Sequence, residues 1–331
     1  MSFANVGIVG AGSWGTALAL LLHGNGIPVT MWGHDAEHIR EIAARRENRF
    51  CLPGIALPPE LRLTVELGDL RDCDLLLLVT PSMAIREVAA RLATSGVRDG
   101  TVLLSCTKGV ERGSGLRMSE VVARHFPNHP IAALSGPSHA EEVARKMPTC
   151  VVLGCADSGI AQKLQRAFTA PFFRAYTSDD IAGVEFGGAL KNIFALAAGV
   201  SDGLGLGDNA KAALVTRALV ELSRLGAALG GKRETFMGLS GLGDLMVTCF
   251  SRHSRNRAVG ERLGKGERLS DIVDSMQMVA EGVPTTYSAF ECARKAGVET
   301  PIIDQVKAIL DGSIAPAAAM ARLLGRDPKP E

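Results

Sequence analysis

One lysine stands near the centre of an otherwise apolar segment. Residues 184–200 read VEFGGALKNIFALAAGV, and Lys191 lies near the middle. Burying an ammonium group is costly, so its pKa should fall towards neutrality unless an anion pairs with it. A lysine of this kind can give a proton to a substrate oxygen or take one from it. The alternative is a lysine whose stem is buried while its head reaches water. Gly187 and Gly188 would let another backbone, or a cofactor, approach closely.

A glycine motif near the amino terminus has the spacing of a dinucleotide-binding loop. The pattern G-x-G-x-x-G occurs at Gly10, Gly12 and Gly15, after a predicted strand and at the start of a predicted helix. In such loops the first glycine makes a tight turn, the second admits a pyrophosphate, and the third lets helix and strand pack closely. The amino end of the helix then favours the negative charge of the pyrophosphate. This context predicts a dinucleotide site rather than an ordinary glycine-rich turn.

The end of the second predicted strand bears on the choice between NAD and NADP. An acidic residue there would bind the ribose hydroxyls and repel a 2′-phosphate. The chain has His34 at the contact position and Asp35 one place later. His34 could accept a phosphate or be an ordinary surface residue, and Asp35 could still hold a ribose. The sequence leans towards NADP, with NAD possible.

Two further segments follow predicted strands, at the sheet edge where ligands bind in such folds. Lys108 comes directly after the strand 102–106, and Gly136, Pro137 and Ser138 come after the strand 131–134. Gly136 and Pro137 shape a turn, and Ser138 is placed to cap the next helix. The alternatives are an ordinary surface lysine and a plain helix cap.

A polar stretch in the second half of the chain suits a phosphate group. Asp244 ends a glycine-rich segment, and Ser254, Arg255 and Asn256 follow it at a predicted helix start. Hydroxyl, guanidinium and amide donors at a helix amino end are good phosphate ligands. The alternative is a solvated basic turn on the surface.

The elements that must position these residues fall into two groups. Short apolar runs alternate with amphipathic stretches up to about residue 180, which is typical of βαβ units and predicts a doubly wound parallel sheet. Longer helical patterns follow over residues 181–200, 209–229, 269–278, 286–296 and 301–310. We therefore expect a dinucleotide-binding domain over residues 1–180 and an all-helical substrate and catalytic domain over residues 181–331. The predicted strands are 5–9, 28–32, 75–80, 102–106, 131–134, 150–153 and 172–176.

Composition excludes several classes of protein. With 36 Lys and Arg against 35 Asp and Glu, the chain lacks the basic excess of a nucleic-acid-binding protein. Its seven cysteines form no CxxC pair, which indicates reduced thiols in a reducing compartment and no metal ligation. No apolar run approaches the roughly 18 residues that span a bilayer. We expect a cytoplasmic protein without a metal, and its apolar helical half makes a homodimer plausible.

Taken together, the motifs identify a family. GAGSWGTALA, CTKG, SGPS, GGALKNIFALAAG, GLSGLGDL, SRNRAVG and VAEG occur in this order over nearly the whole chain. The chain resembles bacterial NAD(P)-dependent glycerol-3-phosphate dehydrogenases, and LKN and SRN with GLGDL between them are specific to that family. It departs from the family at His139, where an aromatic residue is usual.

The resemblance implies a role for each matching residue. Lys191 would be the proton acceptor, and Lys108 would contact both the cofactor and the substrate. The other implied cofactor contacts are Ser13, Trp14, His34, Ala140, Arg255, Val279 and Glu281. The other implied contacts to glycerol 3-phosphate are Gly136, Ser138, Asp244, Ser254, Arg255 and Asn256.

The implied reaction is the reversible reduction of dihydroxyacetone phosphate to glycerol 3-phosphate by NADPH or NADH, which would supply phospholipid synthesis. Two alternatives remain open at this point. One is a 3-hydroxyacid dehydrogenase of the 6-phosphogluconate type, which would act on a carboxylate. The other is a non-catalytic protein that senses a dinucleotide, although a sensor has no need of a phosphate clamp for a substrate.

Overall fold

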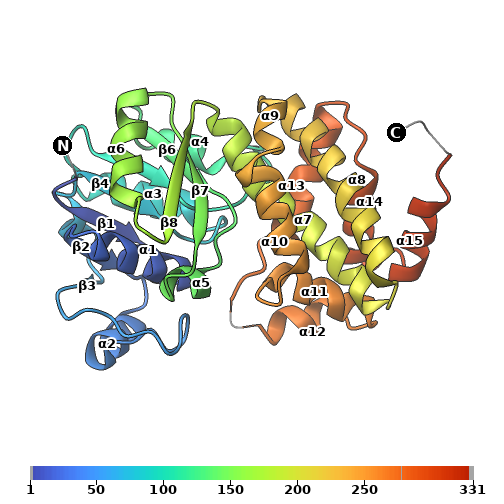
Figure 1. Ribbon diagram of the computed structural model, residues 1–331, viewed down its shortest axis with the longest axis horizontal. Helices are drawn as coiled ribbons and strands as arrows, with labels where there is room; N and C mark the ends of the chain where they lie inside the picture. Colours follow the sequence, from blue (N-terminus) through green and yellow to red (C-terminus); the bar gives the residue numbers. More distant parts are fainter. Residues whose placement is uncertain (1–2, 277, 328–331) are drawn as a thin grey trace. The chain divides into compact units, whose positions relative to one another are not determined.

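The computed structural model describes residues 3–276 and 278–327 and divides into two compact units (Figure 1). The first unit comprises residues 1–108 and 117–185, and the second comprises residues 109–116 and 186–331. The short segment 109–116 therefore belongs to the second unit, although it interrupts the first. The domain boundary that we expected near residue 180 stays a prediction.

The first unit is built on one eight-stranded sheet in the order β3-β2-β1-β4-β5-β6-β7-β8. Every neighbouring pair is parallel except β6 and β7. The predicted doubly wound sheet is confirmed, although it is mostly rather than entirely parallel. The strands are β1 (Val6–Val9), β2 (Val29–Trp32), β3 (Arg62–Thr64), β4 (Leu75–Leu78), β5 (Val102–Ser105), β6 (Ile131–Ser135), β7 (Thr149–Gly154) and β8 (Phe173–Ser178).

Two features of the sheet were not predicted. Strand β3 has only three residues and begins with an exposed arginine, so it carries no apolar run that marks a strand. The reversal between β6 and β7 follows from their connection, which holds only the five-residue helix α5 (Ala140–Ala144). A helix of five residues rises about 7.5 Å, which is too short to return the chain along the sheet for a parallel crossover.

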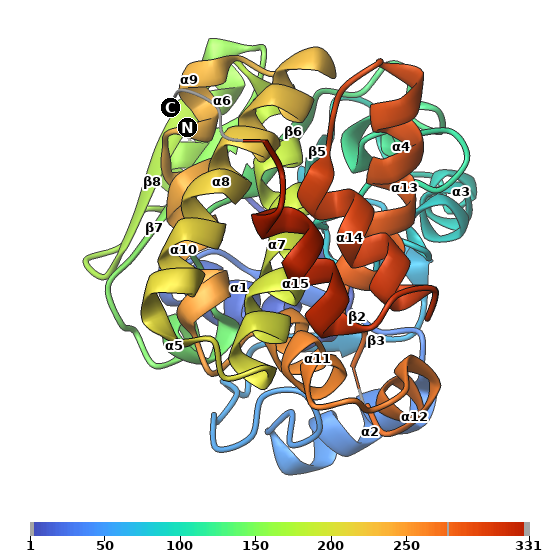
Figure 2. The same ribbon diagram turned by 90° about the vertical axis from the view of Figure 1, so that its right-hand side faces the viewer.

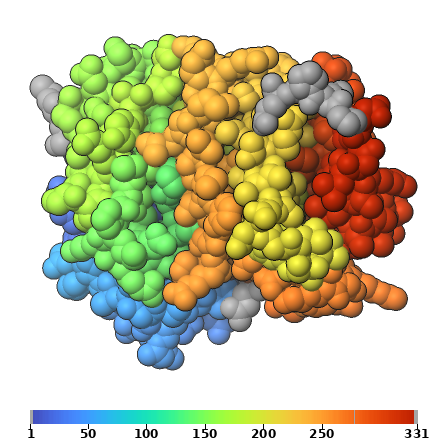
Figure 3. Space-filling model, turned by 45° about the vertical axis from the view of Figure 1, so that its right-hand side comes forward, coloured from blue at the N-terminus to red at the C-terminus, as the bar shows by residue number. Residues whose placement is uncertain are grey.

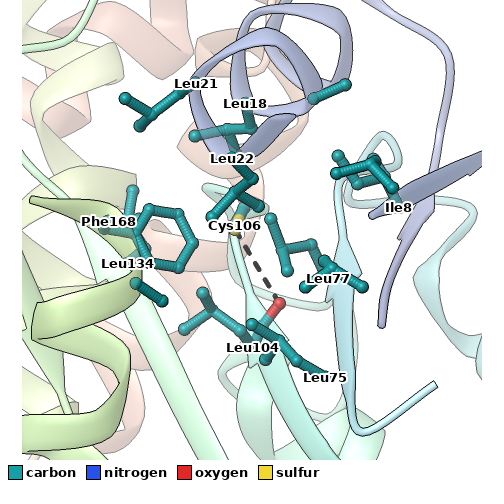
Figure 4. Packing of buried hydrophobic residues seen from close by; sticks show 14 of the residues in the cluster. Ile8, Leu18, Leu21, Leu22, Leu75, Leu77, Leu104, Cys106, Leu134 and Phe168 are labelled. Carbon is teal, nitrogen blue, oxygen red and sulfur yellow. Dashed lines mark hydrogen bonds between the residues drawn. The ribbon is translucent and has the colours of Figure 1, made fainter. Parts of the chain in front are cut away.

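Helices and one 3₁₀ turn surround this sheet, which packs apolar side chains on both of its faces. All four residues of β4 have no exposed surface, as expected for a central parallel strand. Figure 4 shows Leu18 and Leu22 of the first helix packed over the strand residues Leu77 and Leu104. The helical elements, besides α5, are α1 (Ser13–Gly24), α2 (Ala36–Arg45), η1 (Leu67–Leu70), α3 (Ile85–Thr94), α4 (Met118–Ala123) and α6 (Ser158–Phe168).

In the described residues from 186 onward, the second unit consists of helices and the loops that join them, as predicted, while its segment 109–116 contains no helix. Its elements are α7 (Ile181–Gly203, which begins in the first unit), α8 (Gly207–Ala228), α9 (Arg233–Phe236), the π turn η2 (Leu239–Gly243), α10 (Asp244–Phe250), α11 (Arg255–Gly264), α12 (Leu269–Asp274), α13 (Gly282–Lys295), α14 (Pro301–Leu310) and α15 (Pro316–Leu324). Helices α13, α14 and α15 pack side by side in Figure 2, and α8 lies beside α10 in Figure 3. The helix expected over 269–278 is shorter than predicted.

Helix α7 is the core helix of the second half of the chain. Over the described residues it is the one helix long and apolar enough to cross a bilayer by length and composition, so the prediction that no apolar run approaches this length is wrong. However, 89% of its apolar window is buried inside the protein. Burial of this extent is typical of the core helix of a folded domain.

The cysteines agree with the prediction of reduced thiols. All seven are free, and five of them are buried. Over the described residues, no group of three or more His, Cys, Asp or Glu side chains could hold a metal ion.

Candidate functional site

The three glycines of the amino-terminal motif have the geometry that their predicted roles require. Gly10 has φ +131°, and a Cβ there would overlap the carbonyl of Val79. A Cβ on Gly15 would overlap the carbonyl oxygen of Gly10. By contrast, no atom lies within 4 Å of a Cβ built on Gly12. The tight turn at Gly10 and the close packing at Gly15 are therefore present. Gly12 faces open space, where a diphosphate can approach.

The amino terminus of α1 stands at this open position. Gly12 is the N-cap of the helix, and no side chain of the described residues caps it. The Ser13 hydroxyl donates a hydrogen bond to the Cys51 carbonyl at 2.5 Å, and Trp14 packs partly buried against the core. The free N–H groups of a first helical turn bind anions well.

The two residues after β2 have different environments. Asp35 is the N-cap of α2, where its Oδ1 accepts hydrogen bonds from the backbone N–H groups of Glu37 at 2.9 Å and His38 at 3.2 Å. These two backbone bonds lower the pKa of Asp35. His34 lies exposed in the loop before this helix. Asp35 is thus already engaged as a helix cap, while the His34 side chain is accessible from solvent.

Lys108 and Ser138 meet at one backbone oxygen. The Lys108 Nζ lies 3.2 Å from the Gly136 carbonyl oxygen, and the Ser138 hydroxyl lies 3.0 Å from the same atom. Gly136 has φ +135°, a conformation that favours glycine. The prediction that Ser138 caps the next helix is wrong. The N-cap of α5 is His139, without a side-chain cap, because Ser138 instead bonds back to Gly136. Ala140 is the first residue of this helix and is 9% exposed.

Lys191 is buried in the middle of α7 and paired with an anion. The residue is 6% exposed, and its Nζ lies 2.5 Å from Asp244 Oδ1 and 2.6 Å from Thr248 Oγ1. The Thr248 hydroxyl in turn donates to the Asp244 carbonyl at 2.6 Å. The alternative of a lysine whose head reaches water is therefore wrong. Asp244 supplies the negative charge that a buried ammonium group requires.

A close contact between α7 and η2 brings these partners together. A Cβ on Gly187 would lie 2.5 Å from the Ser240 carbonyl oxygen, so a larger residue there would separate the two backbones. The prediction that this glycine allows another backbone to approach is confirmed. Because η2 leads directly into α10, this contact fixes Asp244 and, one turn later, Thr248 opposite Lys191. Neighbours at i and i+4 share one helical face.

Helix α11 also crosses α7 at very short range. A Cβ on Gly199 would overlap the Arg257 carbonyl, and one on Gly260 would overlap the Leu196 carbonyl. At this crossing Asn256 Nδ2 donates to Asn192 Oδ1 at 2.8 Å, and Asn256 Oδ1 accepts from the Gly282 N–H at 2.8 Å. The amide of Asn256 is therefore tied into the interior, one residue along the chain from Arg255.

The start of α11 gathers the other residues predicted to bind phosphate. Ser254 is the N-cap, and its hydroxyl accepts from the Arg257 N–H at 3.2 Å. Arg255 is exposed and donates to the Val279 carbonyl at 2.8 Å. Glu281 follows as the N-cap residue of α13. Arg255, Val279 and Glu281, all predicted cofactor contacts, thus belong to neighbouring segments of the second unit.

Two residues of this cluster were absent from the predicted site. Thr248 lies four residues after Asp244, and this spacing is the signal that could have assigned it to the same helix face. Asn192 follows Lys191 directly, but its partner Asn256 is 64 positions away. No local spacing could have revealed that bond.

Comparison with known proteins agrees with the motifs. The family model described as NAD-dependent glycerol-3-phosphate dehydrogenase N-terminus matches residues 5–161, and the corresponding C-terminus model matches residues 180–321. The chain is 48% identical over 330 residues to glycerol-3-phosphate dehydrogenase [NAD(P)+] of Geobacter sulfurreducens, covering 98% of each protein. It is 46% identical to the enzyme of that name from Desulfitobacterium hafniense, covering 99% of this chain and 93% of that protein.

A solved structure shows the same fold. The crystal structure of glycerol-3-phosphate dehydrogenase from Coxiella burnetii matches with a TM-score of 0.93 and 40% sequence identity, over 98% of this chain and 99% of that one. Both the sequence and the fold are therefore shared along nearly the full length of the chain. The chain belongs to the NAD-dependent glycerol-3-phosphate dehydrogenase family.

Proposed function

We propose that this chain is an NAD(P)-dependent oxidoreductase that reduces dihydroxyacetone phosphate to sn-glycerol 3-phosphate, reversibly, and so supplies glycerol phosphate for phospholipid synthesis. The observation that carries the proposal is the buried Lys191–Asp244 pair at 2.5 Å. Family membership supports the reaction class, since relatives covering the whole chain carry the name of this enzyme.

Lys191 is the proposed proton donor in the direction of ketone reduction. The reduced nicotinamide, when bound, supplies the hydride that the carbonyl carbon takes up. The carbonyl oxygen takes a proton from the Lys191 ammonium group, which regains one from water, so that the ketone becomes a secondary alcohol. Asp244 and Thr248 hold Nζ in place. In the reverse direction neutral Lys191 accepts the alcohol proton.

The phosphate of the substrate is assigned to the start of α11. Ser254 and Arg255 are consecutive at this helix end, where backbone N–H groups and the helix dipole favour an anion. Asn256 is bonded to Asn192 and Gly282, so we assign it a share in fixing the helix end as well as any contact to the phosphate. Gly136, Ser138 and Lys108 are further proposed substrate contacts, and they converge on one carbonyl.

We propose that both NADPH and NADH serve as cofactors, with NADPH preferred. The first unit offers an open Gly12 at the amino end of α1. The exposed side chain of His34 suits a 2′-phosphate, and the use of Asp35 as a helix cap reduces its capacity to bind ribose hydroxyls. The remaining assigned cofactor contacts are Ser13, Trp14, Lys108, Ala140, Arg255, Val279 and Glu281.

A substrate comparison tests the proposal. The purified protein is mixed with NADPH, and oxidation of the cofactor is followed with dihydroxyacetone phosphate and, separately, with dihydroxyacetone. We expect turnover with the phosphate ester and a large loss without the phosphate. The reverse assay with NADP and 3-hydroxy acids addresses the rival dehydrogenase. Turnover with hydroxy acids alone would contradict the proposal, and binding of NADPH without any turnover would indicate a sensor.

We further propose that the protein works in the cytoplasm, as a homodimer, and without a metal ion. The free cysteines suit a reducing compartment. Sedimentation of the purified protein measures the oligomeric state, and activity after treatment with a chelator tests the independence from metal.

A further inference from the structure

Asn48 is a buried polar side chain of the first unit that has no assigned role. It has no exposed surface. Its Nδ2 donates to the Ala11 carbonyl and to Thr16 Oγ1, both at 2.9 Å. Its Oδ1 accepts from the Cys51 N–H at 3.2 Å and lies 2.9 Å from His38 Nε2. An asparagine side chain has two donor hydrogens and two acceptor sites, so all four are used.

The partners of Asn48 fix the orientation of its amide. The Ala11 carbonyl can only accept a hydrogen bond, and the Cys51 N–H can only donate one, so nitrogen and oxygen cannot be exchanged. It follows that His38 carries its proton on Nε2, since it faces the amide oxygen. Asn48 thus joins the glycine-rich loop, α1, α2 and the turn at Cys51 through one buried group.

Two of these bonds set the direction of peptide groups in the dinucleotide loop. In a trans peptide the carbonyl and the following N–H point to opposite sides. Because Asn48 holds the Ala11 carbonyl, the N–H of Gly12 points away from Asn48. The Gly12 carbonyl is held by the Thr16 N–H at 3.0 Å and by the Thr16 hydroxyl at 2.9 Å, and that hydroxyl accepts from Asn48. The N–H of Ser13 is therefore directed as well.

Asn48 also fixes the position of Ser13, indirectly, through the backbone of Cys51. The Ser13 hydroxyl donates to the carbonyl of Cys51, and the N–H of Cys51 donates to Asn48. The residues on either side of Gly12 are thereby linked to Asn48, Ala11 directly and Ser13 through Cys51. The space beside Gly12 stays open, so the directed N–H groups have room for an anion.

We propose that Asn48 is a positioning residue for cofactor binding, which aims the N–H groups of Gly12 and Ser13 at the diphosphate of the dinucleotide. The inference rests on the proposed function, because it presumes a dinucleotide at this loop. Asn48 does not contact the cofactor in this account. It fixes the loop beforehand, so that binding does not have to order it.

Asn48→Asp tests the proposal with little change in shape. The variant keeps the acceptor for Cys51 and His38 but places a carboxylate oxygen against the Ala11 carbonyl. We expect the dissociation constants of NADPH, NADH and ADP to rise by one common factor, on the order of 10-fold. The factor is common because all three ligands carry the diphosphate, while the 2′-phosphate of NADPH lies elsewhere. The KM for dihydroxyacetone phosphate and kcat at saturating NADPH should stay unchanged.

Asn25→Asp is the matched control. Asn25 also donates from Nδ2 to two carbonyls, those of Ala167 at 2.8 Å and Thr169 at 3.2 Å, but it stands at the other end of α1. We expect it to lower Tm without weakening any of the three nucleotides. Should Asn48→Asp not fold, Thr16→Val removes the shared hydroxyl and should weaken all three nucleotides in the same direction.

Several outcomes would overturn the inference. Unchanged nucleotide affinity in Asn48→Asp, or in Thr16→Val where only that variant folds, would remove the positioning role. Equal weakening by Asn48→Asp and Asn25→Asp, in proportion to their loss of Tm, would show a purely structural role. Failure of the proposed function looks different, because the unmodified protein would then bind no dinucleotide or would not reduce dihydroxyacetone phosphate.

Discussion

At the scale of single residues, the proposed chemistry depends on a charge that is costly to bury. Lys191 and Asp244 lie almost wholly out of water, and each compensates the other. Removing one member of such a pair leaves an uncompensated charge inside the protein. The pair therefore has to be tested by a readout that separates catalysis from stability.

Lys191→Met supplies such a test, because methionine fills the space without an exchangeable proton. We expect kcat to fall by about 100-fold or more, as for loss of general acid catalysis, while the affinity for NADPH is kept. Lys211→Met is the matched control. Lys211 is also a buried lysine of this unit, paired with Asp202 at 2.8 Å, and its loss should lower Tm but leave most turnover. Near-normal kcat in Lys191→Met would remove the assigned role.

Residue types and spacing predicted much of this site but not its internal bonds. Lys191 and Asp244 could be named as candidates because a lysine in an apolar helix and an aspartate in a glycine-rich segment are conspicuous. Asn48 gave no signal, because it lies in a polar stretch and two of its partners, Ala11 and Thr16, are 37 and 32 positions away. Ser138 was misassigned because its spacing fits a cap, whereas its hydroxyl bonds to Gly136.

At the scale of elements, glycines determine how closely the helices of the second unit approach. Gly199→Ala should force α7 and α11 apart, because a Cβ there would overlap the Arg257 carbonyl. The separation would stretch the bond from Asn256 to Asn192 and displace the start of α11. We expect a fall in Tm and a rise in the KM for dihydroxyacetone phosphate.

Gly24→Ala is the control for that substitution. Gly24 is also helical, but no atom lies within 4 Å of the added Cβ, so Tm should hold or rise slightly and KM should not move. If the Gly199→Ala protein kept the KM of the unmodified enzyme, substrate binding would not depend on the crossing of α7 and α11. Enzyme kinetics and thermal unfolding measure both effects.

Glu221 links two elements in a way that depends on pH. Its carboxylate on α8 accepts from the N–H groups of Ile302 at 3.0 Å and Ile303 at 2.9 Å, at the start of α14. Burial raises its pKa from 4.5 to about 7, although these two bonds and Arg224 act in the opposite direction. A carboxyl whose pKa is higher in the folded state binds its proton more readily when folded. Its contribution to stability is therefore present below pH 4.5 and is lost as the pH rises through 7.

Glu221→Gln removes this titration. Between about pH 4.5 and 7 the free energy of unfolding of the unmodified protein should lose on the order of 2–3 kcal/mol from this one group. The variant should lack that part of the slope, even if its stability is lower at every pH because glutamine offers one carbonyl oxygen to two N–H groups. Denaturant unfolding at several pH values measures the slope. Parallel curves for the two proteins would contradict the assignment.

The order of the elements was predictable where periodicity is strong. The apolar run of β4 and the segment 301–310, which is α14, were predicted closely. Strand β3 and helix α15 were missed because each is short and has few buried residues. The reversed direction of β7 and β8 could not be read from their own residues, since it depends on the short connection through α5.

At the scale of the whole molecule, the chain forms two compact units, to which we assign different ligands. The first provides an open helix amino end next to a glycine turn, and the second provides a buried amine and a polar helix start. Short apolar runs that alternate with amphipathic stretches, followed by longer helical patterns, predicted a part built on a sheet and a helical part. The transfer of segment 109–116 to the second unit was not predictable, because it depends on tertiary packing rather than on any local pattern.

The thiols give a test of the whole fold. Burial raises the pKa of Cys73 to about 11 and that of Cys249 to about 12, and only Cys51 and Cys150 are partly exposed. We expect a thiol-specific chromogenic reagent at mildly alkaline pH to label at most these two quickly in the folded protein. All seven should react after unfolding without reductant. Fewer than seven in the unfolded protein would indicate disulfides, and more than two fast thiols would contradict the described packing.

The most direct measurement is a crystal structure of the protein with NADP and glycerol 3-phosphate bound. We expect Lys191 Nζ within about 3 Å of the substrate hydroxyl oxygen that becomes the ketone oxygen, with the phosphate at the start of α11. A substrate whose reacting oxygen lies against another side chain, with Lys191 still closed on Asp244 and out of reach, would contradict it.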